Sequence, residues 1–351
     1  MTDGPCAVPP AVQMTALRTA LRTALMTTLM TVLMTMLMTV LATAPAAAKD
    51  TGMVYVSSEK DNAIVVIDAK SLTVAGTIPT CKRPRHMQWL PGKTTLMVAC
   101  SDSNRADLID VATRKSVGSL PFGDNPEMFD LSPDGRLAYV SIEDNGELAV
   151  IDIVARKLLR ATKVGPEPEG VKVSPDGKRV YVTSEVANMV HVVEADSGRI
   201  LKNIAVGKRP RRFALNADGS ELWVTNELAA SVSVISVQDL AVTGTVVFSV
   251  PGLRADDITP VGITLLQGGK TMAVALGRAN HVAFVDVASK RTRSLTLVGK
   301  RAWGLAQSND GTRLYVANGL SDDMTVIDVA SAKAIKTVPV GRVPHTVVVD
   351  D

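Results

Sequence analysis

GPEPEGVKVSPDGKRVYVTSEVANMVHVVEADSGRILKNIAV, residues 165–206, contains four short apolar runs separated by turns. The first two runs, VKV and VYV, flank a Ser-Pro-Asp-Gly turn, and an Asp-Ser-Gly turn separates the last two. Period-two β-branched and aromatic runs broken by Pro, Asp and Gly are typical of consecutive antiparallel strands. Because a lone four-stranded unit cannot bury both its faces, this stretch needs neighbours of its own kind.

The same unit recurs along the chain with a fixed spacing. The centre of the second run returns at steps of 42 residues, with one step of 50, at Tyr55, Met97, Tyr139, Tyr181, Trp223, Ala273 and Tyr315. The proline before the first run and the residue that ends the third run, most often Asp, follow the same spacing. A period in the low forties with four strands per unit predicts the blade of a β-propeller.

The repeats predict an all-β, seven-bladed β-propeller with four antiparallel strands per blade. The first repeat begins with a second strand at residues 53–57, and the chain ends with a first strand at residues 347–349. We therefore expect the C-terminal strand to join the three N-terminal strands and close the ring, which removes exposed sheet edges. The repeats fill residues 53–349 without a linker, so we expect one domain over residues 49–351.

Residues 1–48 have a different composition. Arg18 and Arg22 precede an uncharged run of Leu, Met, Val, Ala and Thr, and Ala-Pro-Ala-Ala-Ala follows. This order predicts a secretory signal peptide cleaved after Ala48, or alternatively after Ala46, and export to the periplasm. An uncleaved membrane anchor is the alternative, because the apolar run is long enough to span a bilayer. Only in that case do we expect contact with a membrane.

Charge and motifs exclude several classes of function. The chain has 38 basic and 35 acidic residues and no basic stripe with interleaved aromatics, so we expect no nucleic-acid partner. It contains no Cys-x-x-Cys-His, HExxH, G-x-S-x-G or P-loop motif. A metal site at His86 and His345 would need a third ligand that the sequence does not supply, so we predict neither a metal nor catalytic residues.

Two repeated features have structural explanations. An aspartate at the end of the third strand is expected to accept hydrogen bonds from the amides of the next turn, at Asp68, Asp110, Asp152, Asp286 and Asp328. Tyrosines at the second-strand centres are expected to pack in the core. Cys81 and Cys100 lie in neighbouring repeats on the same face of the ring, and export permits a disulfide, but the sequence leaves their pairing open.

The functional surface is expected where the loops before the first strands surround the channel mouth. The residue after the proline varies there among Arg, Glu, Val, Trp and His, which is typical of a binding surface on a rigid scaffold. The candidate residues are Arg83, Arg85, His86, Glu127, Glu169, Arg211, Arg301, Trp303, Arg342 and His345.

We expect these residues in separate arcs: a basic and aromatic arc across the ring closure, an acidic arc of Glu127, Glu167 and Glu169, and a second basic arc around Arg211. Arginine suits a small anionic molecule or an acidic protein patch. The alternative is a solvated rim of ion pairs between blades.

The step of 50 residues places an insertion over the same face. It falls within residues 247–260 and carries Arg254, Asp256 and Asp257. These residues are a candidate lid over the channel. The alternative is a tolerated insertion, because surface loops lengthen at little cost in free energy.

Several strands resemble those of the YVTN-repeat β-propellers, a group of WD40-like repeat proteins. The matching residues are LWVTN at 222–226, VYVT at 180–183 and LYVAN at 314–318, with VIDV-type third strands. The opening MVYVSSE at 53–59 is most similar to the propeller proteins associated with PQQ-dependent catabolism. The resemblance implies a role beside periplasmic quinoprotein alcohol oxidation, with a quinoprotein dehydrogenase or a c-type cytochrome as the protein partner.

Two functions from different classes follow. The first is an exported, non-catalytic binding or scaffold protein that serves such a redox system. The second is an enzyme that uses the channel mouth, either a lactonase-like hydrolase or an oxidoreductase that binds haem d1 or a quinone. The fold does not discriminate between them. No cofactor is evident from the residues, and PQQ and haem stay open as ligands.

Overall fold

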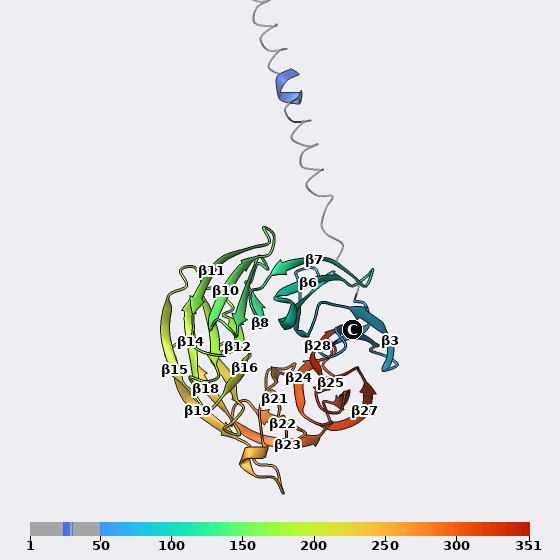
Figure 1. Cartoon of the computed structure of the whole chain (residues 1–351), viewed down its shortest axis with the longest axis vertical. Helices are drawn as coiled ribbons and strands as arrows, with labels where there is room; N and C mark the ends of the chain where they lie inside the picture. The colour runs from blue at the N-terminus through green and yellow to red at the C-terminus, as the bar shows by residue number, and fades with distance from the viewer. Residues whose placement is uncertain (1–23, 29, 31–49) are drawn as a thin grey trace, which may run out of the picture. The chain divides into compact units, whose positions relative to one another are not determined.

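Seven four-stranded sheets form a closed ring in the computed structural model (Figure 1). The structure describes residues 24–28, 30 and 50–351. In blade 1 the order from the axis outward is β28 (Pro344–Asp350), β1 (Met53–Ser58), β2 (Ala63–Asp68) and β3 (Thr73–Pro79). The predicted all-β, seven-bladed propeller is confirmed.

The remaining blades each follow the chain from the inner strand outward. They consist of β4 (Pro84–Trp89), β5 (Thr95–Cys100), β6 (Arg105–Asp110) and β7 (Lys115–Pro121) in blade 2; β8 (Pro126–Leu131), β9 (Leu137–Ile142), β10 (Glu147–Asp152) and β11 (Lys157–Lys163) in blade 3; β12 (Pro168–Val173), β13 (Arg179–Ser184), β14 (Met189–Glu194) and β15 (Ile200–Ala205) in blade 4; β16 (Pro210–Leu215), β17 (Glu221–Asn226), β18 (Ser231–Ser236) and β19 (Ala241–Val247) in blade 5; β20 (Ile263–Leu265), β21 (Thr271–Ala275), β22 (His281–Asp286) and β23 (Arg291–Leu297) in blade 6; and β24 (Ala302–Gln307), β25 (Arg313–Asn318), β26 (Asp323–Asp328) and β27 (Lys333–Pro339) in blade 7. Two short 3₁₀ turns, η1 (Ser101–Ser103) and η2 (Ala255–Asp257), lie outside the sheets.

The ring closes as the sequence predicts. The C-terminal strand β28 pairs antiparallel with β1, with Val349 opposite Val54 and Val348 opposite Tyr55. The apolar core lies between adjacent blades; Tyr181 of blade 4, for example, packs with Leu222 and Val224 of blade 5. The second-strand aromatics Tyr55, Tyr139, Tyr181, Trp223 and Tyr315 are all buried, so their predicted packing role is confirmed.

The repeated aspartates hold the turns that follow the third strands. Asp68 Oδ1 accepts a 2.7 Å hydrogen bond from the Ser71 amide, and Asp328 Oδ1 accepts one of 2.8 Å from the Ser331 amide. The three other aspartates of this column make the same contact. Their structural role is confirmed.

A disulfide joins Cys81, directly after the outer strand of blade 1, to Cys100, at the end of β5 in blade 2. The Cys81 amide donates a 2.9 Å hydrogen bond to Asp107 Oδ2, which fixes the loop entering blade 2. The bond therefore ties the first two blades together on the face where the loops before the inner strands gather.

The predicted signal peptide falls almost wholly outside the described residues and stays a prediction. Within the described part of the chain, no helix combines the length and the apolar character needed to cross a membrane.

Removal of residues 341–351 should open the ring and lower its stability. Loss of β28 exposes the partner edge of β1 and removes the buried side chains of Val347 and Val349. Burial of a valine is worth about 1.5–3 kcal/mol, so the free energy of unfolding should fall by at least about 3–6 kcal/mol, with association of the exposed edge. Calorimetry and light scattering measure both effects. A truncated protein that melts like the full chain and stays monodisperse contradicts the closure.

Replacement of both Cys81 and Cys100 by Ala should lower the free energy of unfolding by about 3 kcal/mol, because the bond closes a loop of 19 residues. Denaturant titration of the oxidised chain, the reduced chain and the double variant measures the effect. The reduced chain should match the variant; equal stability of all three would count against a stabilising bond.

Candidate ligand site at the channel mouth

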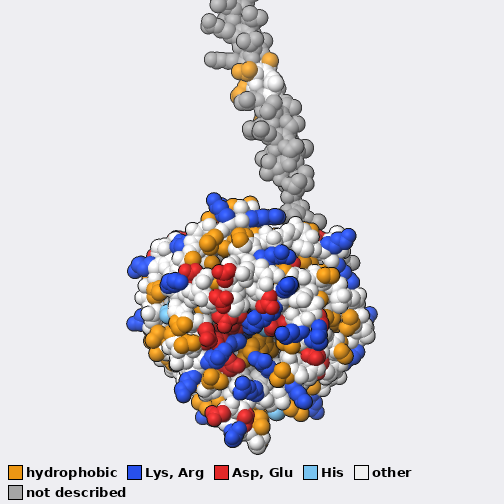
Figure 2. All heavy atoms as spheres, in the orientation of Figure 1, with side chains coloured by type: hydrophobic (Ala, Val, Ile, Leu, Met, Phe, Trp, Pro, Cys, Tyr) orange, Lys and Arg blue, Asp and Glu red, His pale blue; other side chains and the backbone are white. Residues whose placement is uncertain are grey.

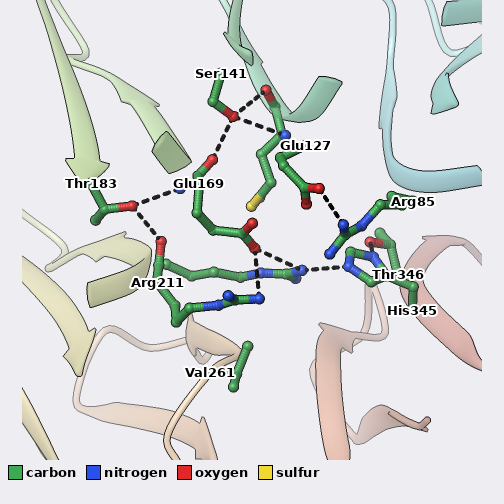
Figure 3. A network of polar contacts seen from close by, with 12 residues as sticks. Arg85, Glu127, Ser141, Glu169, Thr183, Arg211, Val261, His345 and Thr346 are labelled. Carbon is green, nitrogen blue, oxygen red and sulfur yellow. Dashed lines mark hydrogen bonds and ion pairs between the residues drawn. The ribbon is translucent and has the colours of Figure 1, made fainter. Parts of the chain in front are cut away.

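Side-chain hydroxyls on the second strands hold the backbone at the channel mouth. Thr183 Oγ1 accepts a 2.7 Å hydrogen bond from the Gly170 amide of its own blade and donates one of 3.0 Å to the Arg211 carbonyl of the next blade. Ser141 Oγ joins the Met128 amide to the Glu169 carbonyl in the same way (Figure 3). We call these contacts the hydroxyl bridges; Ser57 and Thr225 form two more.

The hydroxyl bridges are needed because each of these inner strands contains an irregularity. The pairing of β12 with β13 shifts register between Pro168 and Val171, so the Gly170 amide has no partner in the sheet. A register shift of this kind re-aims the neighbouring side chain. Gly170 is required here, because a Cβ atom would lie 2.0 Å from the Arg211 carbonyl oxygen. The residue after each proline therefore projects toward the axis from a fixed backbone.

A cavity of about 250 Å³ occupies the channel mouth. Acidic and basic side chains gather at the centre of the ring in Figure 2. The cavity is lined by six glutamates and five arginines, together with Trp303, Gly319, Val343, Pro344 and His345: Glu59, Glu127, Glu143, Glu169, Glu185, Glu227, Arg83, Arg85, Arg209, Arg211 and Arg301. The volume is below the about 300–1,000 Å³ of pockets for drug-sized ligands, so the cavity suits a smaller, polar solute.

Buried ion pairs between blades form its floor. Arg85 of blade 2 is in close contact with Glu127 of blade 3, and the Arg211 guanidinium of blade 5 lies 3.3 Å from the Glu169 carboxylate of blade 4. Arg211 also contacts Glu185 closely. The side chains of Arg85 and Glu127 are 8% and 2% exposed. Two neighbouring glutamates, Glu127 and Glu169, are thus flanked around the axis by an arginine on each side, and all four side chains are shielded from water.

A second contact divides the channel below this floor. The Arg212 guanidinium lies 3.0 Å from His345 Nε2 and 4.0 Å from the Glu169 carboxylate (Figure 3). His345 Nδ1 contacts Thr346 Oγ1 at 2.9 Å, so both ring nitrogens are engaged and neither is free for a metal or haem iron. A second cavity, of about 230 Å³, lies on the inner strands and is lined by residues that include His86 and Arg212.

The buried carboxyl groups have opposite protonation preferences. Burial, together with the neighbouring Glu169, raises the pKa of Glu127 well above its usual value. Burial raises the pKa of Glu185 to about 8. Burial also acts to raise the pKa of Glu169, but the charges of Arg211, Arg85 and Arg212 outweigh it and lower that pKa to about 2. Glu127 and Glu185 therefore keep their protons to higher pH than an ordinary glutamate, whereas Glu169 stays ionised.

Arg301 differs from the other arginines of the cavity. It forms no ion pair with any residue of the described chain, in contrast to the other four arginines of the cavity. Its guanidinium lies 4.4 Å from the centre of the Trp303 ring, and that of Arg211 lies 5.2 Å from the same ring. The buried indole Nε1 of Trp303 has no hydrogen-bond partner. An unpaired cation and an unpaired donor thus lie side by side in the cavity wall.

Eight of the ten predicted mouth residues line this cavity, and two do not. His86 follows Arg85 on β4, so its side chain points the other way and lines the second cavity. Arg342 lies outside and pairs with Asp61 at 2.6 Å, with 66% of its side chain exposed. The predicted order around the ring is present, with Glu127 and Glu169 between Arg85 and Arg211, but ion pairs across the blade boundaries join these arcs. They match the alternative of ion pairs between blades, except that they are buried and not solvated.

The candidate lid residues do not line the cavity. Arg254 pairs with Asp257 at 3.1 Å in the exposed turn η2, and Asp256 is exposed beside them. Phe248 and Ile258, on either side of the turn, pack into the core between blades 5 and 6. The structure therefore favours the interpretation as a tolerated insertion.

Sequence reasoning missed four of the six glutamates. Each directly follows a second strand, and they share the repeat spacing, at Glu59, Glu143, Glu185 and Glu227. This column was readable from the sequence. Its partners were not, because pairing depends on which side chains meet between neighbouring blades.

The chain is thus a seven-bladed β-propeller with a charged cavity at the mouth of its channel. Similar solved structures include the periplasmic gluconolactonase PpgL of Pseudomonas aeruginosa, with 21% identity, a TM-score of 0.73 and coverage of 85% of this chain and 99% of that one. Hydrazine synthase of Kuenenia stuttgartiensis has 20% identity, a TM-score of 0.71 and coverage of 80% and 93%.

The dihydro-haem d1 dehydrogenase NirN, in complex with DHE, has 16% identity, a TM-score of 0.65 and coverage of 88% and 77%. At these identities the likeness shows the fold alone. Comparison with family models found no match, and comparison with curated proteins found none either.

His86 should stay neutral far into the acid range. Burial and the charge of Arg212 lower its pKa from 6.5 to about 3. Unfolding below pH 6.5 then takes up a proton, so this residue's contribution to stability is present above pH 6.5 and is lost as the pH falls toward 3. NMR titration of the imidazole measures the pKa directly, and H86Q should lose less stability than the wild type over that range. An imidazole that titrates near pH 6.5 contradicts the burial.

Proposed function

We propose that the protein is an exported, non-catalytic β-propeller that binds a small anionic molecule at its channel mouth and serves a periplasmic PQQ-dependent alcohol oxidation system. The observation that carries the binding role is Arg301, which has no carboxylate partner among the residues that the structure describes, whereas the other arginines of the cavity are paired. An uncompensated guanidinium in a half-enclosed site favours carboxylate or phosphate ligands.

The accessory role rests on the sequence resemblance to the propeller proteins of PQQ-dependent catabolism. It makes a quinoprotein dehydrogenase or a c-type cytochrome the protein partner. Export rests on the composition of residues 1–48. The scaffold is suited to such a role, because its hydroxyl bridges fix the mouth loops in place before any ligand arrives.

A hydrolytic function is the second candidate, favoured by one observation. Glu127 and Glu185 are carboxyl groups with raised pKa values beside arginines in the same cavity, and such groups are suited to general acid catalysis. A neighbour by fold, PpgL, is a gluconolactonase. Turnover of an aldonolactone that is abolished in E185Q, with the fold intact, would favour this candidate over the binding role.

Arg301→Ala should remove the bound anion, and Lys300→Ala should not. Lys300 is the adjacent residue, carries the same charge and is exposed outside the cavity, so it is a matched control. Native mass spectrometry of protein purified from its own periplasm detects a bound solute by its mass, whatever its identity. Wild type and K300A should carry the same small mass, and R301A should lack it.

Affinity purification of the full chain from the same periplasm tests the accessory role, with a dehydrogenase or cytochrome expected in the eluate. An R301A variant that keeps the same bound mass would refute the anion site. A chromophore bound to the chain itself would refute the accessory role.

A further inference from the structure

The mouth cavity has two poles, and they lie on opposite sides of the ring. One pole, on blade 7, is formed by Arg301 and Trp303. The other, on blades 3 and 4, is formed by Glu127 and Glu169. In a ring of seven, blades 3 and 4 lie across the axis from blade 7, as the inner strands β8, β12 and β24 show in Figure 1.

The blade 7 pole offers donors only. The Arg301 guanidinium has no anionic partner among the described residues, and the Trp303 indole Nε1 is buried without an acceptor. An unpaired buried donor costs about 1–3 kcal/mol unless a ligand satisfies it. A carboxylate suits this pole, because its two oxygens can accept from both groups at once.

The opposite pole offers an acceptor at Glu169, which stays ionised, and at Glu127 a carboxyl group that both donates and accepts when it is protonated. Glu127 Oε2 and Glu169 Oε1 are both buried without a hydrogen-bond donor, and Glu169 Oε1 has only its ion-pair contacts with Arg211 and Arg212. Ligand groups that reach this pole must therefore donate a hydrogen bond to Glu169 and can accept one from Glu127. Hydroxyl and ammonium groups can both donate hydrogen bonds. They differ in charge, and the charge of the pole decides between them.

Three arginines already surround the two glutamates of this pole. Glu169 lies between Arg211 and Arg212, and Glu127 contacts Arg85 closely. An ammonium group would add a positive charge beside three arginines, whereas hydroxyls donate without adding charge. Hydroxyls also accept, which suits the buried Arg85 Nε, a donor without a partner.

From this juxtaposition we infer that the ligand is a small hydroxycarboxylate, with its carboxylate on Arg301 and Trp303 and its hydroxyls toward Glu127 and Glu169. The inference rests on the proposed binding function and names the chemical class of its ligand. The cavity volume of about 250 Å³ accommodates a chain of a few carbons, since water occupies about 30 Å³ per molecule in the liquid.

A matched series of six-carbon solutes tests the inference by isothermal titration calorimetry on the mature chain. Gluconate carries a carboxylate and hydroxyls, sorbitol carries hydroxyls alone, hexanoate carries a carboxylate alone, and 6-aminohexanoate pairs a carboxylate with an ammonium. Gluconate should bind at least tenfold more tightly than each of the others. R301A should weaken gluconate binding by about tenfold to a hundredfold, because a hydrogen bond to a charged group is worth about 1.5–3 kcal/mol, and K300A should leave it unchanged.

Each contrary result has a distinct meaning. Sorbitol binding equal to gluconate would overturn the carboxylate pole, and 6-aminohexanoate binding tighter than gluconate would overturn the hydroxyl pole. If none of the four binds while the natively purified protein still carries an anion that R301A loses, the hydroxycarboxylate class is wrong and the proposed function stands. Melting temperatures of R301A and K300A equal to the wild type show that the variants are folded.

Discussion

The structure depends on a recurring pair of hydrogen bonds, in which a hydroxyl of the second strand accepts from an amide of its own blade and donates to a carbonyl of the next. Thr183 and Ser141 show it most completely. The inner strand needs an irregularity to turn side chains toward the axis, and the irregularity leaves an amide unpaired. The hydroxyl satisfies that amide and also joins the blades, so the backbone of the mouth is fixed whatever side chain it carries.

A fixed backbone explains how so many charges are tolerated in one place. Burial of an ion pair is favourable only when the geometry is good and both partners are present. A hydroxyl bridge holds the blades of Arg211 and Glu169 in register. The backbone positions that set the distance between their side chains are therefore fixed. The result is a mixed-charge cavity in which Arg301 is the one lining arginine without an ion-pair partner in the described part of the chain.

The sequence was sufficient for the fold and for most of the cavity lining, but not for the pairing within it. Three columns with a common spacing establish the blades, and ring closure follows from the strand at each end of the chain. The sequence placed Arg85 and Glu127 in adjoining arcs, but it did not show that their side chains meet across the blade boundary. His86 was misplaced because a shift of one residue along a strand reverses the side-chain direction. Arg301 was named from the sequence, but its lack of a partner is visible only once the other arginines are seen to be paired.

The central claim is that Trp303 and Arg301 form the wall on which a carboxylate-bearing solute binds. Tryptophan fluorescence during titration with gluconate tests this claim most directly, with W303F as the reference, because Trp89 and Trp223 remain in that variant. We predict a saturable change in emission in the wild type and no change in W303F. A change that persists in W303F, or no change in the wild type at any concentration, would contradict the account.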